Sequence, residues 1–144
     1  MLFAKYRKGE ILKRYSFPKE KRLINSSQFK AVLSRNLRAS DGLLTLFMAE
    51  NDCSYRRLGI SVGRSCGGAV VRNRLKRLLR EVFRQNQEQI PTSFDYVLMI
   101  SSQLLKKTGK SGDVRDIIIH LTFERLKASF LALVADAIEK NAQK

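Results

Sequence analysis

One stretch of the sequence combines the residue types that hold a polyanion. Residues 56–84 contain nine basic side chains and a single acidic one, Glu81. Guanidinium groups stay charged at any physiological pH, and they bind phosphate through two parallel hydrogen bonds. Positive charge concentrated in this way is typical of surfaces that contact nucleic-acid backbones. The sequence therefore predicts an RNA or DNA contact in this region.

The net charge of +15 is focused in two parts of the chain. Residues 1–40 carry +9 and residues 56–84 carry +8, whereas residues 41–55 carry −3 and residues 85–144 carry +1. The alternative interpretation is a soluble domain with ordinary solvated faces, but it does not account for the focusing. We expect cationic patches rather than a uniformly charged surface.

Residues 69–87 are expected to form a helix with one apolar and one cationic side. At about 100° per residue, five aliphatic side chains share one stripe: Val71, Leu75, Leu78, Leu79 and Val82. The opposite side carries Arg72, Asn73, Lys76, Arg77, Arg80 and Arg84, with Arg74 at the edge. Like charges one turn apart cost about 0.2–0.5 kcal/mol per pair in an isolated helix, and a bound anion would offset that cost.

The elements that must position this helix are those of a small α/β domain. The patterns predict a capped helix near 26–35, strands at Leu43–Ala49, Arg56–Gly63 and Asp95–Ser102, and a final helix from Thr122 to about Lys140. A further short strand near Leu43–Cys53 would complete a sheet. The expected fold is an α+β sandwich with a four-stranded sheet and three helices, in the order α-β-β-β-α-β-α. Lys106–Gly112 is expected to be a polar loop, and Ile117–Ile119 is either a strand or a buried turn.

The strand at Arg56–Gly63 has two different faces. Leu58, Ile60 and Val62 point one way, and Arg57, Gly59, Ser61 and Gly63 point the other. The second face is small and polar, so it either floors a groove or is an ordinary solvent-facing surface. In the first case, Gly59 and Gly63 leave room for a ligand backbone to approach.

The chain length and composition predict one domain with an arm. A chain of 144 residues that is 44% hydrophobic can bury one core. Residues 1–19 are basic with scattered aromatics and are expected to be a flexible N-terminal arm, and residues 20–144 a single domain. The sequence contains no apolar run long enough for a membrane span and no secretory signal, so an intracellular soluble protein is expected.

Residue patterns for protein-based catalysis are weak. A hydrolase acting alone needs a nucleophile with a base, paired carboxylates or clustered metal ligands. The single histidine, His120, has no such partner pattern, and Asp113 with Asp116 is a thin basis for a metal site. Cys53 and Cys66 fit no zinc motif and are expected to be small buried thiols. The sequence favours a protein that positions a nucleic acid over one that cleaves it unaided.

The basic region resembles the bacterial ribonuclease P protein subunit. The strand Leu58-Gly-Ile-Ser-Val62, a basic turn, and Gly67-Gly-Ala-Val-Val-Arg-Asn-Arg-Leu-Lys-Arg77 are similar to that family's signature. Weaker similarity in flanking segments extends the resemblance to about residues 20–140. Four positions depart from the family pattern: Ser65 and Gly68 at the turn, and Leu33 and Phe47 in the cleft.

The resemblance implies two binding surfaces and an unusual connection. The family's helix contacts the catalytic RNA, which maps to Arg64, Arg72, Asn73, Arg74, Lys76, Arg77 and Arg80. Its cleft between the first helix and the sheet holds the single-stranded leader, which maps to Arg22, Phe29, Phe47 and Ser61. Phe29 also fits a plain core role, and Arg74 a simple edge charge. A left-handed crossover between the third and fourth strands is implied, against the usual rule.

The implied function is that of a subunit without an active site of its own. The protein would bind the ribonuclease P RNA and precursor tRNA, and assist removal of the 5′ leader, while the RNA performs the chemistry with magnesium. No protein-held metal or cofactor, no membrane and no further protein partner are expected, and the location is the bacterial cytoplasm. The alternatives are a general RNA-binding or ribosome-associated protein of similar fold, and a protein-only metal nuclease.

Overall fold

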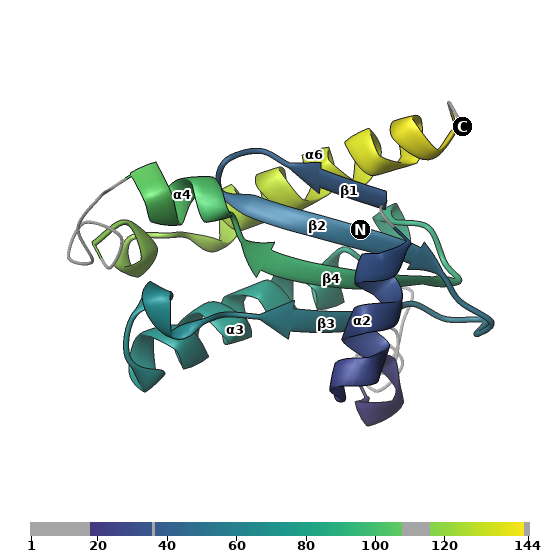
Figure 1. Ribbon diagram of the computed structural model, residues 1–144, viewed down its shortest axis with the longest axis horizontal. Coiled ribbons are helices and arrows are strands. Elements are labelled where there is room, and N and C mark those ends of the chain that lie inside the picture. Colours follow the sequence, from purple (N-terminus) through teal and green to yellow (C-terminus); the bar gives the residue numbers. More distant parts are fainter. Residues whose placement is uncertain (1–17, 36, 108–115, 143–144) are drawn as a thin grey trace, which may run out of the picture.

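The computed structural model describes residues 18–35, 37–107 and 116–142, which build a four-stranded sheet with helices on both faces (Figure 1). The strands are β1 (Leu37–Ser40), β2 (Leu44–Glu50), β3 (Arg57–Ser61) and β4 (Phe94–Ile100), in the order β1-β2-β4-β3. β2 is antiparallel to β1 and β4, and β3 is parallel to β4. The predicted four-stranded sheet is confirmed. The hand of the connection from β3 to β4 stays a prediction.

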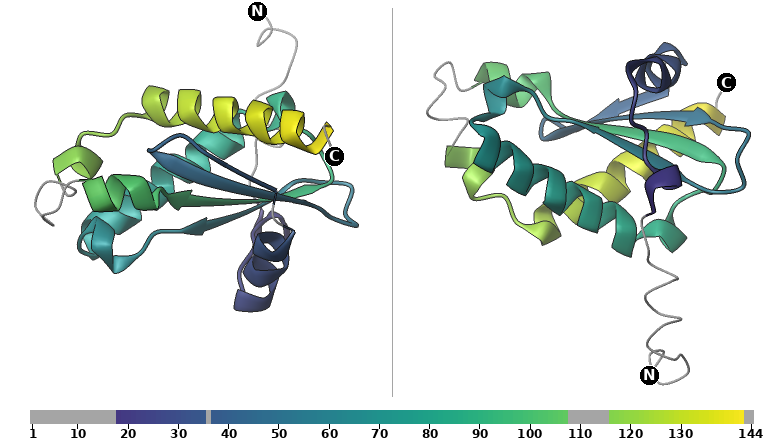
Figure 2. Two further views of the ribbon diagram at one scale, coloured as in Figure 1. Left: turned by 45° about the horizontal axis from the view of Figure 1, so that its top comes forward. Right: turned by 90° about the horizontal axis from the view of Figure 1, so that it is seen from below.

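The helices divide between the two faces of the sheet. α2 (Ser26–Ser34) lies on one face, and α3 (Ala69–Gln85) and α6 (Phe123–Ala142) lie on the other (Figure 2). Asn25 caps α2, because its side chain accepts a hydrogen bond from the Gln28 amide at 2.9 Å. α6 begins after Thr122, whose hydroxyl accepts a hydrogen bond from the Arg125 amide at 3.3 Å. The three predicted helices are therefore present near their predicted bounds.

Three local predictions are wrong. The further short strand expected near Leu43–Cys53 lies instead before the Asp41-Gly42 turn, as β1, and its four residues are too few to give a clear pattern in the sequence. Lys106 and Lys107 belong to α4 (Ser102–Lys107) and not to the expected polar loop, whose residues 108–112 lie outside the described residues. Residues 116–119 are helical with Ile118 buried, so the total of three helices was too low. Asp113 lies outside the described residues, and so does nearly all of the predicted arm. The last residue of the arm, Lys19, begins the short helix η2 (Lys19–Lys21).

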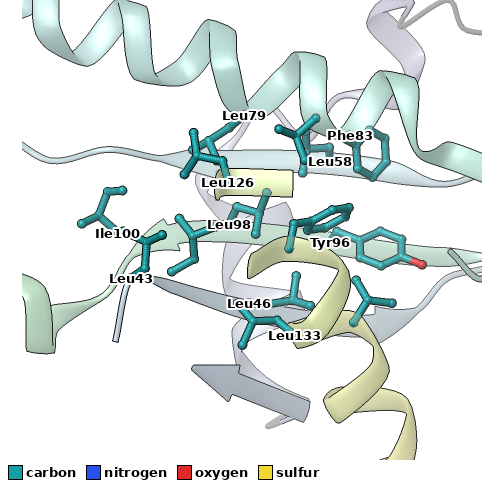
Figure 3. Close-up of a cluster of buried hydrophobic side chains, with 14 of the residues drawn as sticks. Leu43, Leu46, Leu58, Leu79, Phe83, Tyr96, Leu98, Ile100, Leu126 and Leu133 are labelled. Carbon is teal, nitrogen blue, oxygen red and sulfur yellow. The ribbon is translucent and has the colours of Figure 1, made fainter. Parts of the chain in front are cut away.

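The main core lies between the sheet and the α3–α6 layer (Figure 3). Phe83 of α3, Tyr96 of β4 and Phe130 of α6 form an aromatic cluster, with ring centroids 5.7 Å apart for Phe83–Tyr96 and 6.2 Å for Phe83–Phe130. An apolar stripe of α6 is buried in this core: Leu126, Phe130, Leu133, Val134 and Ala137. In α3, Leu75, Leu79 and Val82 are buried, and Val71 and Leu78 are half-buried. The apolar sides of both helices therefore face the sheet, which turns their polar sides outward.

Candidate nucleic-acid interface

A glycine turn sets the start of α3. Gly67 has a φ of 136°, a backbone conformation that side chains rarely adopt, and its neighbour Gly68 is the N-cap residue. Gly68 provides no side-chain cap, whereas an asparagine at this position could accept a hydrogen bond from the first turn. The turn leads directly from β3 through η3 (Arg64–Cys66) into the cationic helix.

The outer side of α3 presents most of the predicted basic side chains to solvent. Arg77 and Arg80 are exposed, Lys76 is half-buried, and Arg64 is exposed on η3 just before the helix. Asn73 is exposed beside them. Within the described part of the chain, none of these four cations forms an ion pair. Their charges are therefore available to an external anion.

Arg74 has a structural role in addition to its charge. Its guanidinium donates hydrogen bonds to the carbonyl oxygens of Ile118 and Leu121, at 3.3 and 3.0 Å. These carbonyls lie in the segment that leads into α6, so Arg74 links α3 to that segment. The interpretation of Arg74 as a simple edge charge is therefore incomplete. Its side chain is exposed and positively charged, but it also holds two backbone carbonyls.

Arg84 does not belong to the available cationic side. Its guanidinium pairs with Glu81 one turn earlier, with an Nη2–Oε2 distance of 2.7 Å. The hydrogen bond from Arg84 is the main reason that the pKa of Glu81 lies below its ordinary value. The one acidic residue of the basic region thus neutralises the last arginine of α3.

Arg72 is less exposed than Arg77 and Arg80 of the same helix. It is half-buried, and its Nε atom is buried without a hydrogen-bond partner among the described residues. The neighbouring Cys66 is buried as predicted, and burial raises the pKa of its thiol. Cys53 is only half-buried, and both cysteines are free.

The open space expected above Gly59 is filled by the protein itself. A Cβ atom at this position would lie 2.6 Å from Cζ of Phe29 and 3.1 Å from Cβ of Leu23. Gly59 therefore lets α2 pack against β3, and the prediction that a ligand backbone approaches here is wrong. Phe29 is half-buried and packs against a second core cluster that contains Val97.

The remaining predicted leader residues lie on the same face of the sheet as α2. Phe47 on β2 and Gly59 on β3 both pair with Val97 of β4, and Ser61 pairs with Met99. Phe47 is half-buried and has the Arg38 guanidinium 5.9 Å from its ring centroid. Arg38 is thus a further cation of this face that the sequence analysis did not identify.

The ion pair of Arg57 explains why this basic residue is not available on that face. Arg57 binds Asp95 through two hydrogen bonds of 2.7 Å each. The Asn51 amide donates a further hydrogen bond to the same carboxylate at 2.8 Å. Arg57 therefore stabilises the sheet beneath α2.

A groove follows the free edge of β3, between the chain around η2 and α3. It has a volume of ≈ 540 Å³ and is lined by Arg22 and Phe29 of the predicted leader set and by Lys76 and Arg80 of the predicted RNA-binding set. The structure thus brings together parts of two sets that the sequence kept separate, while Phe47 and Ser61 lie on the open sheet surface. Five further lining residues were missed: Lys19, Leu23, Ile24, Leu58 and Ile60. Ile24 is 63% exposed, and an isolated isoleucine gives no pattern in a sequence.

Within residues 18–35, 37–107 and 116–142, no three His, Cys, Asp or Glu side chains gather closely enough to hold a metal ion. His120 is exposed, and its Nδ1 lies 2.7 Å from the carbonyl oxygen of Asp116. None of the helices in these ranges is long and apolar enough to cross a membrane.

Comparisons with known proteins agree on one family. A family model for ribonuclease P matches residues 17–122. A ribonuclease P protein component from Clostridium botulinum is 33% identical over 100 residues, which cover 69% of this chain and 86% of the relative. One from Alkaliphilus metalliredigens is 30% identical over 100 residues, with 69% and 88% covered.

Solved structures show the same fold. The RNase P protein from Thermotoga maritima is 28% identical, covers 78% of this chain and 94% of its own, and has a TM-score of 0.63. The Staphylococcus aureus RNase P protein is 22% identical, covers 81% of this chain and 94% of its own, and also has a TM-score of 0.63.

Proposed function

The chain belongs to the ribonuclease P protein family, and on that premise we propose that it is the protein subunit of a bacterial ribonuclease P. It binds the catalytic RNA and the 5′ leader of precursor tRNA, and assists the endonucleolytic removal of that leader. The observation that carries the proposal is the outer side of α3, where Lys76, Arg77 and Arg80 form no ion pair within the described residues.

The α3 side suits the folded catalytic RNA. Guanidinium groups on a rigid helix keep fixed positions, and they bind phosphates without having to lose an internal partner first. The surface comprises Arg64, Arg72, Asn73, Arg74, Lys76, Arg77 and Arg80. The half-buried Arg72 and the hydrogen-bonded Arg74 would contribute less than the exposed cations.

The α2 face of the sheet suits a single strand. Half-buried rings at Phe29 and Phe47 can stack on bases, which is worth about 1–3 kcal/mol per base and tolerates any base. Ser61 and Arg22 supply a hydroxyl and a cation at the border of this surface. The leader would therefore lie across the sheet beside α2.

In this proposal the RNA subunit performs the phosphodiester hydrolysis with its own magnesium, and the protein positions the substrate. No further protein partner is required, and the complex works in the bacterial cytoplasm. The protein lowers the magnesium needed because its cations offset phosphate repulsion between catalytic RNA and precursor tRNA.

Reconstitution tests the proposal. Adding the purified chain to catalytic RNA should raise the rate of precursor-tRNA cleavage at low magnesium, and unrelated structured RNAs should compete poorly for the chain. Equal affinity for unrelated RNAs would indicate a general RNA-binding protein. Cleavage by the chain without RNA would indicate a protein-only nuclease, and no effect across magnesium and salt series would overturn the proposal.

A further inference from the structure

The groove at the β3 edge has a cationic rim on both walls. Lys76 and Arg80 line it from α3, and Lys19 and Arg22 line it from the opposite side. No acidic side chain lines it among the described residues. Its volume of ≈ 540 Å³ falls in the range of about 300–1,000 Å³ typical of small-ligand sites. The charge is complementary to a phosphate-bearing ligand.

The floor of the groove is apolar. It is formed by Ile24, Phe29 and Ile60, together with parts of Leu23 and Leu58. Ile24 is 63% exposed, so its side chain is accessible to a bound base. An apolar floor below a basic rim matches the chemistry of a nucleotide, whose base is flat and apolar on its faces and whose flanking phosphates are anionic.

The edge of β3 adds main-chain groups to this site. β3 is the last strand of the sheet, and the Leu58 carbonyl on its free side accepts a hydrogen bond from the Leu23 amide at 2.9 Å. Backbone groups alternate sides along a strand, so those of Ile60 point to the same free edge as those of Leu58. The backbone N–H and carbonyl of Ile60 therefore lie on the free edge of β3, beside the groove.

We propose that this groove binds one unpaired nucleotide of the precursor-tRNA leader, with the base on Ile24 and Ile60 and a flanking phosphate on Lys76 and Arg80. The inference rests on the proposed leader binding and extends its path. Ser61 follows Ile60 directly on β3 and lies on the open sheet face, so a strand leaving that face passes Phe29 and enters the groove. Lys76 and Arg80 lie at the border of the α3 surface, where they contact the leader in addition to the role that the proposed function gives them toward the catalytic RNA.

Leader length provides the decisive measurement. The holoenzyme is assembled from the full chain and catalytic RNA, and affinity is measured for precursor tRNAs with leaders from one nucleotide to about ten. Lys76→Ala with Arg80→Ala should weaken binding roughly tenfold for long leaders and less than about twofold for the one-nucleotide leader. The matched control, Arg64→Ala with Arg77→Ala, removes the same charge outside the groove and should show a loss that does not depend on leader length.

A second experiment tests the base. Replacing the bound leader nucleotide by an abasic one should cost the wild-type complex about 5- to 100-fold in affinity. Ile24→Ala alters an exposed side chain, so the fold is retained, and the abasic penalty should shrink at the same leader position. A photo-crosslinking residue at position 24 should label the leader, whereas one at position 138, an exposed isoleucine of α6, should not.

Several outcomes would overturn the groove proposal: the same affinity loss at every leader length, an abasic penalty unchanged by Ile24→Ala, or a crosslink from position 24 to the catalytic RNA. The two proposals also fail separately. If the wild-type affinity for precursor tRNA does not depend on the leader at all, both proposals are overturned: leader binding by the protein and the groove assignment. If wild-type affinity depends on the leader and the Lys76→Ala, Arg80→Ala variant keeps that dependence in full, only the groove assignment falls.

Discussion

The two long helices on one face of the sheet have the same packing role and opposite surface character. α3 and α6 both bury an apolar stripe against the same core. α3 carries six basic side chains and one acidic, a net charge of +5, whereas α6 carries three of each and is neutral. Because packing needs only the buried stripe, it does not explain the net charge of α3. The contrast separates what the fold requires from what a polyanionic partner requires.

The outer sides of the two helices also treat their charges differently. In α6, Lys140 pairs with Asp136 one turn away, at 3.2 Å. In α3, only Arg84 has such a partner on its own helix, while Lys76, Arg77 and Arg80 form no ion pair within the described residues. A surface helix that binds no charged ligand would gain about 0.2–0.5 kcal/mol of stability from each such ion pair. The part of α3 that forms the proposed interface has no such pairs among the described residues.

The largest expected effect tests whether α3 and α6 contribute equally to the stability of the core. Phe83→Ala in α3 and Phe130→Ala in α6 should each lower the free energy of unfolding by about 3–5 kcal/mol, since both rings are fully buried. Their centroids are 6.2 Å apart, so the double variant should lose less than the sum. Urea denaturation measures all three values. A cost near zero for either variant would show that the helix concerned is not part of the core.

A smaller effect is expected where α3 is linked to the segment before α6. Arg74→Ala removes hydrogen bonds to the Ile118 and Leu121 carbonyls and should cost about 1–2 kcal/mol of unfolding free energy. Arg77→Ala, an exposed neighbour of the same charge, should change stability by less than about 0.5 kcal/mol. Equal costs in urea denaturation would mean that the two carbonyl contacts contribute nothing and that Arg74 is an edge charge only.

The long periodic elements could be predicted from the sequence, and the short ones could not. The apolar stripes of α3 and α6 repeat over several turns, so spacing alone is enough to indicate their buried sides. β1 spans four residues and α4 six, which is too short for a period to stand out. Ile117–Ile119 is apolar at every position, so periodicity could not separate a strand from the observed helical turn.

The sequence was enough to predict where the charges of the candidate site lie, but not which other residues of the chain its side chains contact. The helical period placed Lys76, Arg77 and Arg80 on the outer side because that depends on local geometry. The contacts of Arg74 with Ile118 and of Phe29 with Gly59 join residues that are 44 and 30 positions apart, which no local pattern specifies. Chain folding, rather than residue type, therefore decided which cations remained available.

The charge contrast predicts a difference in salt dependence. Arg64→Ala with Arg77→Ala should reduce the slope of log affinity for catalytic RNA against log salt by about 0.7–0.9 per lost phosphate contact. Arg125→Ala with Lys127→Ala removes the same charge from α6 and should leave the slope unchanged. Filter-binding titrations over a salt series measure both slopes. If the α6 variant shows the larger change, the proposed RNA surface is on the wrong helix.

The smallest effect concerns the acid that interrupts the cationic helix. Arg84 holds the pKa of Glu81 below its ordinary value of 4.5, so the pair stabilises the folded state above that pH and the contribution is lost as the pH falls through the lowered pKa. Both groups are partly exposed, so Glu81→Gln should cost no more than about 0.5 kcal/mol at pH 7. In urea denaturation that difference should vanish in acid.

The same substitution frees Arg84 and raises the charge of α3, so affinity for catalytic RNA at low salt should increase slightly. Asp136→Asn is the matched control, because it breaks the corresponding pair with Lys140 on α6 at a similar small cost in stability. It raises the net charge by the same amount, but away from the proposed interface. An equal gain in RNA affinity from both variants would show that total charge, rather than its position on α3, governs binding.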